Sequence, residues 1–163
     1  MIQNWKLFIE NLEADSDDEI KKSINVIQID SRQRTVNLVK VDNWTYNKIT
    51  ELIGHGCRIF TSVYYYPNED TLYTDDEFLI REFDTEVDDK GMYNPADCGF
   101  ILIPYSKEYP LWGNAVIVGA DDDGESDNVK SILNNIRKDI VFIDKSEGIK
   151  AWRWDGEKYK QFR

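Results

Sequence analysis

Histidine and cysteine, the side chains that most often bind transition metals or serve as nucleophiles, are almost missing from the sequence. Its 163 residues include one histidine, His55, and two cysteines, Cys57 and Cys98. A zinc site takes four ligands from Cys, His or carboxylate side chains, and the His55-x-Cys57 pair supplies two. No oxyanion hole or third, orienting group is evident near this pair, so we expect no nucleophilic role for it. We expect His55 to be a turn residue between Gly54 and Gly56, and both cysteines to be free thiols.

Sequence motifs of nucleotide and nucleophilic chemistry are also absent. The sequence has no Gly-x-Ser-x-Gly elbow, no phosphate-binding loop and no dinucleotide-binding fingerprint. An acidic run at residues 121–127 invites a calcium-loop interpretation. However, placing Gly124 at the sixth position of such a loop puts Gly119 first and Lys130 twelfth, where carboxylates are needed. We expect a solvated turn that caps a following helix, and we predict no metal site and no cofactor.

Long apolar runs are missing as well. The longest near-continuous ones, residues 100–103 and 115–118, are far shorter than the roughly 20 residues of a membrane-spanning helix. The first ten residues, MIQNWKLFIE, lack the basic segment and apolar stretch of a secretory signal. We therefore expect a cytoplasmic protein that does not bind membranes.

Basic residues are outnumbered, with 20 Lys and Arg against 31 Asp and Glu and a formal net charge of −11. This balance argues against direct binding to nucleic acid or anionic lipid. Residues 10–19 hold six acids and no base, residues 69–97 hold eleven acids and two bases, and residues 145–163 hold six bases and three acids. We expect a solvated connector, an acidic insertion and a basic C-terminal hairpin, respectively. The hairpin binds either the acidic insertion or an external partner.

The chain does contain enough apolar material, 41% of its residues, for the core of one domain. Runs rich in β-branched or aromatic residues predict strands at 24–29, 36–41, 57–66, 71–74, 100–103 and 115–118, and alternation around Asp155-Gly156 predicts the hairpin at 145–163. Helical spacing predicts helices at 43–53 and 127–138, the second with Asp127 as its N-cap. Trp5, Leu7 and Ile9 alternate as in a strand, although Phe8 and Leu12 also permit a helical turn. We expect one α+β domain, residues 1–163 with a core at 24–143, in which a mostly antiparallel sheet packs against two helices.

The acidic insertion, residues 69–97, is the candidate binding surface. Phe78, Ile80, Phe83 and Val87 indicate that part of it packs, because a purely solvated segment holds few aromatic residues. Its charge either imitates a row of phosphates and occupies the DNA-binding groove of another protein, or only keeps the surface solvated. The acids expected to steer a partner are Asp84, Glu86, Asp88 and Asp89. The aromatic residues expected to anchor it are Tyr105, Tyr109 and Trp112.

The order of these elements is similar to that of a known family. The matching pieces are residues 26–30, the strand to Val41, the helix ending Glu51-Leu52-Ile53-Gly54, the aromatic strand from Cys57, and the run Gly113-Asn114-Ala115-Val116-Ile117-Val118-Gly119 before an acidic turn and a helix. Over residues 24–137 this order resembles domain of unknown function 3846, common in phage and mobile-element genomes. The N-terminal segment, acidic insertion and Trp-rich hairpin depart from it. The family has no established activity, so the resemblance implies no catalytic residue; it implies a phage accessory protein, which often binds and disables a host protein.

These observations predict a non-enzymatic protein of the bacterial host cytoplasm. We expect it to bind and inhibit a host or defence protein, with nucleic-acid-binding proteins among the candidates, through an acidic, aromatic surface. Two alternatives stay open. A toxin-immunity protein has the same size, charge and lack of catalytic motifs. The 31 acids also allow a carboxylate or metal-dependent enzyme acting on a nucleotide.

Overall fold

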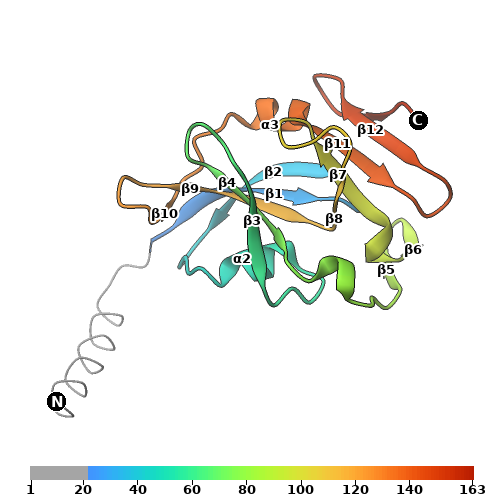
Figure 1. The fold of residues 1–163 in the computed structure, drawn as a ribbon, viewed down its shortest axis with the longest axis horizontal. Coiled ribbons are helices and arrows are strands. Elements are labelled where there is room, and N and C mark those ends of the chain that lie inside the picture. Colours follow the sequence, from blue (N-terminus) through green and yellow to red (C-terminus); the bar gives the residue numbers. More distant parts are fainter. Residues whose placement is uncertain (1–21) are drawn as a thin grey trace, which may run out of the picture.

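The computed structural model describes residues 22–163, and Figure 1 shows their fold. They form two antiparallel sheets, a separate two-stranded hairpin and two short helices, with 42% of these described residues in strands. The prediction of an α+β protein with mostly antiparallel strands is confirmed at this level, although the sheets dominate the helices. The predicted N-terminal strand and the acidic run at 10–19 lie outside the described residues. Within residues 22–163 no helix has the length and apolar character needed to span a membrane.

The first sheet has the strand order β2-β1-β9-β4-β3, and a short strand, β10, pairs with the end of β9. Its strands are β1 (Ile24–Asp30), β2 (Thr35–Val41), β3 (Phe60–Tyr65), β4 (Thr71–Asp75), β9 (Ala115–Ala120) and β10 (Ser126–Asp127). The two predicted hairpins, at 24–41 and 57–74, are confirmed by the β1–β2 and β3–β4 pairings. The central strand β9 is buried over its first five residues, because both faces of the sheet are covered.

The second sheet has the order β13-β12-β11-β7-β8. Its strands are β7 (Cys98–Leu102), β8 (Leu111–Trp112), β11 (Ile140–Asp144), β12 (Lys150–Trp154) and β13 (Tyr159–Gln161). The C-terminal hairpin is confirmed, since Trp154 pairs with Tyr159 and β13 ends the sheet. Strand β11 was not predicted, although its apolar run of four residues is typical of a buried strand.

The main core lies between the two sheets, where Ile27, Ile29 and Ile117 of the first sheet face Phe100 and Phe142 of the second. All five side chains are fully buried. Alternation along β1 points its other apolar residues to the opposite face, where a smaller core lies beneath the first helix. The first sheet is therefore the middle layer of the fold (Figure 1).

Both helices are shorter than predicted. The first, α2 (Lys48–Ile53), starts five residues late: Asn43 has a φ of 52°, outside the right-handed helical region, and Asn47 is the N-cap. The second, α3 (Leu133–Asp139), was predicted to start near Asp127, which instead pairs with Gly119 in β10. The prediction was wrong for residues 127–132.

A distant carboxylate explains the late start of α3. Asp70, which is fully buried, accepts hydrogen bonds from the backbone N–H groups of Lys130 and Ser131 at 2.8–3.1 Å. These bonds hold the chain before the helix in an extended form, while Val129 still packs against the main core. The apolar spacing identified residues that are buried, but tertiary hydrogen bonding set where the helix begins.

Only part of the predicted acidic insertion leaves the sheets. Residues 71–75 form β4, which lies between β9 and β3 in the first sheet. The remainder contains two 3₁₀ turns, η1 (Phe78–Ile80) and η2 (Pro95–Asp97), and the hairpin of β5 (Glu86–Asp88) and β6 (Gly91–Tyr93). Phe78 is buried and stacks on Phe83 at 4.6 Å, as expected, whereas Ile80 and Val87 are exposed.

Candidate functional site

The β5–β6 hairpin turns its charged side chains toward the rest of the protein. Side chains alternate across a strand, so Glu86 and Asp88 share one face and Val87 lies on the other. The partners of the two acids are Arg32, in the β1–β2 turn, and His55, after α2. The hairpin is therefore bound to the body of the protein through its acids.

Asp88 makes the stronger of the two attachments. Arg32 donates to it through Nε at 2.8 Å and through a terminal nitrogen at 3.0 Å, a bidentate arrangement. The Gln33 side chain adds a third bond at 3.2 Å, and the Arg32 guanidinium lies 4.3 Å from the ring centroid of Tyr93. The hydrogen bonds from Arg32 lower the pKa of Asp88 from its usual 3.8 to about 2.

Glu86 makes the second attachment. Its Oε2 accepts the Tyr93 hydroxyl at 2.6 Å and lies 3.0 Å from Nδ1 of His55. The tyrosine hydrogen bond, with a smaller contribution from His55, lowers the pKa of this carboxyl group. His55 is the expected turn residue, with a φ of 50° between Gly54 at 71° and Gly56 at 73°. The expectation that no third group orients His55 was wrong, because the Glu86 carboxylate lies 3.0 Å from its Nδ1. Glu86 is 31 positions away in the chain, so its side chain could not be placed from the sequence.

The neighbouring thiol does not complete a nucleophilic pair with His55. Cys57 donates weakly to the carbonyl of Ile59, and burial raises its pKa to about 11, so the thiol is protonated near neutral pH. Burial likewise raises the pKa of Cys98 to about 12. Both cysteines are free thiols, as predicted. Among residues 22–163, no three His, Cys, Asp or Glu side chains gather in a way that could hold a metal ion.

The outward face of the hairpin is apolar. Val87 and Met92 are directly opposite each other in the β5–β6 register, and their exposed fractions are 75% and 73%. Leu79 and Ile80 in the preceding turn are exposed by 80% and 81%. These four values are the highest among the large apolar side chains described, and all fall between residues 79 and 92. We call these four residues the hairpin surface.

The four predicted steering acids do not form one group. Glu86 and Asp88 are half-buried and engaged within the chain, whereas Asp84 and Asp89 are exposed. No side-chain hydrogen bond or ion pair of Asp84 or Asp89 occurs within the described part of the chain. In the sequence these two exposed acids fall between the residues of the hairpin surface, and they carry unpaired negative charge.

The three predicted anchors are divided between the two ends of β7. Trp112 pairs with Gly99 near the start of β7, on the side of the acidic hairpin, and Lys145 Nζ lies 4.2 Å from its ring centroid. Tyr105 and Tyr109 are exposed in the connection that follows β7, beyond Leu102. A five-residue strand spans about 13 Å, so the two tyrosines lie away from the acids that they were expected to accompany.

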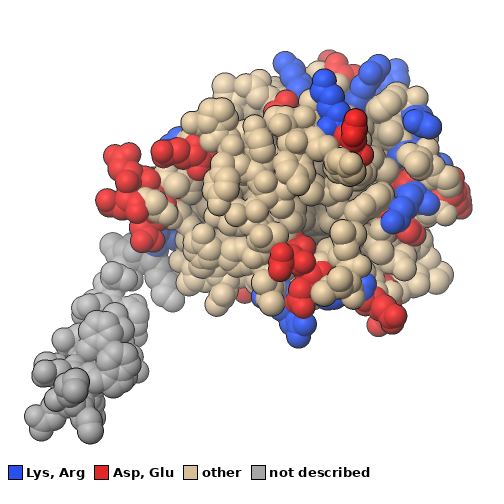
Figure 2. Space-filling view, viewed as in Figure 1, with Lys and Arg blue, Asp and Glu red and all other residues tan. Residues whose placement is uncertain are grey.

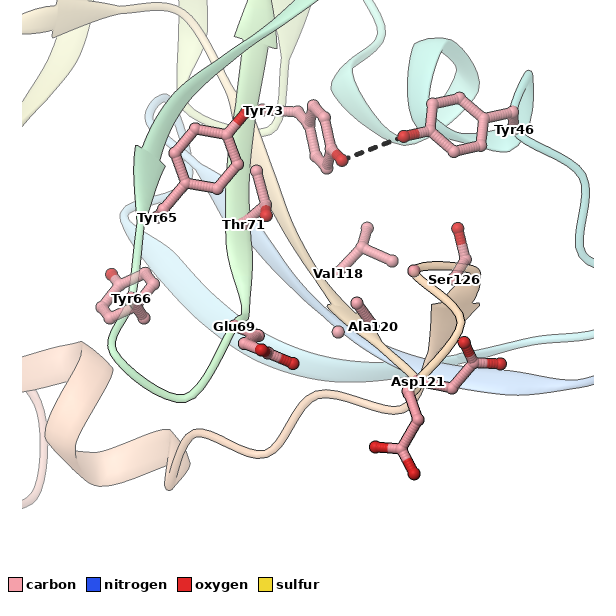
Figure 3. A pocket seen from close by; sticks show the side chains of 13 residues that line it. Tyr46, Tyr65, Tyr66, Glu69, Thr71, Tyr73, Val118, Ala120, Asp121 and Ser126 are labelled. Atoms are coloured by element: carbon pink, nitrogen blue, oxygen red, sulfur yellow. Dashed lines mark hydrogen bonds between the residues drawn. The ribbon is translucent and has the colours of Figure 1, made fainter.

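Sequence reasoning missed a groove lined by tyrosines on the first sheet, beside α2 (Figure 3). Its volume is about 400 Å³. Thr71 and Tyr73 of β4 and Val118 of β9 form its floor, and Tyr46 and Tyr65 lie at its rim. The hydroxyls of Tyr46 and Tyr73 are 3.0 Å apart and hydrogen bonded.

The charges of this groove restrict what it can hold. Three carboxylates, those of Glu69, Asp121 and Asp122, line it together with the tyrosines, and no basic side chain does. Carboxylates and aromatic faces both attract cations. Burial raises the pKa of Tyr73, which therefore stays neutral and donates or accepts as a hydroxyl. The groove suits a cationic group and disfavours an anionic one.

No protein-family model, curated protein or solved structure matches the chain. The resemblance to the phage domain therefore stays a prediction.

The attachment of the hairpin is expected to weaken in acid. The folded pKa of Asp88 lies below its ordinary value, so its stabilising effect is complete above about pH 4 and is lost as the pH falls toward about 2. The protection of the amides of residues 86–93, expressed relative to their intrinsic exchange rate at each pH, should fall over that interval. Asp88→Asn should produce the same loss of protection near neutral pH, while Asp89→Asn, next to it but exposed, should not. Equal protection in the wild-type and Asp88→Asn proteins would contradict this role.

Proposed function

We propose that this chain is a non-catalytic binding domain that docks onto another protein through the hairpin surface. The observation that supports this most is the orientation of the hairpin. A solvent-facing hairpin ordinarily buries its apolar side chains and exposes its charges, whereas here Asp88 and Glu86 are held inward and Val87 and Met92 point outward. Exposed apolar groups rimmed by charge are typical of interaction sites.

The partner that fits best has an apolar patch surrounded by basic residues. Asp84 and Asp89 would meet its basic rim, and the net charge of −11 would steer it toward the complex over longer distances. Together with the resemblance to a phage domain, this supports inhibition of a bacterial host or defence protein, including one whose basic surface binds nucleic acid. The protein would act by covering that surface.

A photo-reactive amino acid at position 92 of the full chain tests the proposal. Bacterial lysate is irradiated with this variant and with a control that carries the same group at position 38, where Leu38 is an exposed apolar residue on the edge strand β2. We expect one protein to be crosslinked from position 92 only and to bind the purified chain with a defined stoichiometry. Equal crosslinking from both positions would contradict a specific hairpin surface. A toxin as the captured protein would indicate immunity in place of host inhibition.

The two pairs of acids should behave differently toward that purified partner. Asp84→Asn with Asp89→Asn should slow association several-fold and reduce its salt dependence, because exposed charges act mainly on the association rate. Glu86→Gln with Asp88→Asn should instead loosen the hairpin and increase the dissociation rate. Stopped-flow or surface-binding kinetics at two salt concentrations separate these effects. An unchanged association rate in the first pair would exclude electrostatic steering by these acids.

A further inference from the structure

The C-terminal part of the protein carries a basic surface that the proposed function does not use. In Figure 2 Lys and Arg side chains gather at the upper right, where Figure 1 places α3 and β12, while the β9–β10 turn at the left is acidic. From the sequence, the bases of residues 145–163 were expected to bind either the acidic segment 69–97 or an external partner. Within residues 22–163 no ion pair joins these two segments. The basic hairpin is therefore not neutralised by the acidic one.

A small groove lies within this basic region, between β2, α3 and the β12–β13 hairpin. Its volume is about 210 Å³. Three basic residues line it, Arg34, Arg137 and Lys158, against one acid, Glu157. On a protein of net charge −11, this local excess of positive charge sets the groove apart from the surrounding surface.

Arg34 makes no ion pair within the described part of the chain, although the more distant carboxylate of Asp144 favours its charged form. It ends the β1–β2 turn, and its guanidinium lies 4.1 Å from the ring centroid of Trp152. The side chain is half-buried, and burial lowers its pKa. Within residues 22–163 no carboxylate pairs with it and no acceptor takes its N–H groups, in contrast to Arg32, which is bound by Asp88. A partly desolvated guanidinium without a counter-ion is costly, and an anion in the groove would remove that cost.

A second guanidinium group, that of Arg137, lines the groove together with the indole ring of Trp154. Arg137 is held in place because its Nε donates to the carbonyl of Val36 at 3.0 Å and its guanidinium lies 4.8 Å from the ring centroid of Trp154. The indole N–H of Trp154 is buried and has no acceptor in the described part of the chain. Tyr159 donates its hydroxyl to the Arg137 carbonyl, which fixes β13 against α3. The terminal nitrogens of Arg137 also donate to Asn134 at 3.2 Å and to Asn37 at 3.5 Å, so each keeps one further N–H for a ligand in the groove.

We propose that this groove binds an oxyanion, either a phosphate or a carboxylate group, with Arg34 as its main ligand and Arg137, Lys158 and Trp154 beside it. Guanidinium groups bind both anions with paired, charge-assisted hydrogen bonds. The volume of about 210 Å³ is below that of sites for drug-sized ligands, roughly 300–1,000 Å³, and suits a small ion or one anionic group of a larger partner. The site is independent of the hairpin surface.

Titration of the full chain with inorganic phosphate, and separately with acetate, tests this proposal at constant ionic strength maintained with sodium chloride. The protein has five tryptophans, so the indole N–H signal of Trp154 can be resolved and assigned by NMR. We expect this signal to shift saturably with a midpoint in the millimolar range for at least one of the two anions. A saturable shift with phosphate alone, acetate alone or both supports the site and shows whether it binds a phosphate group, a carboxylate group or either.

Substitutions distinguish a specific anion-binding site from nonspecific attraction of anions to basic side chains. Arg34→Gln should raise the dissociation constant at least about tenfold, and Lys158→Gln, at an exposed position, should raise it several-fold. Arg153→Gln is the matched control, because Arg153 lies in the same hairpin but does not line the groove. The proposal is overturned if Trp154 does not respond to either anion, or if Arg153→Gln weakens binding as much as Arg34→Gln does.

Discussion

Replacing Val87 and Met92 together by serine is expected to weaken partner binding by at least about 30-fold. The two side chains are opposite each other and largely exposed, so they would form the centre of the docked surface. Truncation of central anchors in protein interfaces costs about 2 kcal/mol or more, which corresponds to that factor. Calorimetric titration with the purified, crosslink-identified partner measures the loss.

The same double substitution should leave the fold unchanged, because neither side chain is buried. The free energy of unfolding should change by less than about 0.5 kcal/mol. Leu38→Ser with Ile149→Ser is the control, since these exposed apolar residues lie on other parts of the surface. If this control weakens partner binding as much as the Val87 and Met92 substitutions, the hairpin surface is not the docking site.

Replacing Asp70 by alanine is expected to lower the free energy of unfolding by about 3–5 kcal/mol. The buried carboxylate accepts the backbone N–H groups of Lys130 and Ser131 and the Ser131 hydroxyl, and the alanine would leave all three donors without an acceptor. An unsatisfied buried donor costs about 1–3 kcal/mol, and the charge of the acceptor places this site at the upper end. Urea unfolding followed by circular dichroism measures the difference.

Two further variants distinguish the loss of stability caused by the missing hydrogen bonds of Asp70 from the loss caused by a smaller side chain. Asp70→Asn keeps the volume but offers a single acceptor oxygen, so its cost should be intermediate. Asp76→Ala, an exposed acid at the end of the same strand, should change stability by less than about 0.5 kcal/mol. An Asp70→Ala protein as stable as Asp76→Ala would show that Asp70 does not hold residues 130–131 in front of α3.

The strands could be predicted because their apolar runs report burial directly. The β1–β2 hairpin, β9 and the C-terminal hairpin were placed from residues 24–41, 115–118 and the Asp155-Gly156 turn, where local pattern and tertiary packing agree. The start of α3 could not be predicted, since it depends on a hydrogen-bonded carboxylate 60 positions away. The helical spacing of apolar residues continues through the segment before Leu133, so this spacing alone does not show where the helix begins.

The candidate site was only partly predictable for a related reason. In the Glu86-Val87-Asp88 sequence, the ordinary expectation is that charges face water, and only the positions of Arg32 and His55 reverse it. Both partners are more than 30 positions away, so it could not be predicted that two of the four acids would pair with other residues of the same chain. The tyrosine groove was missed because Tyr46, Tyr65 and Tyr73 belong to separate segments that meet only in the folded sheet.

The position of the docking surface is the central point of the proposed function. Hydrogen–deuterium exchange of the full chain, alone and saturated with the crosslinked partner, locates it without any substitution. Binding through the hairpin surface predicts slower exchange of the amides between residues 79 and 92, with little change at the Leu38 edge strand and at residues 145–163. Slower exchange elsewhere, with residues 79–92 exchanging as fast as in the free chain, would contradict it.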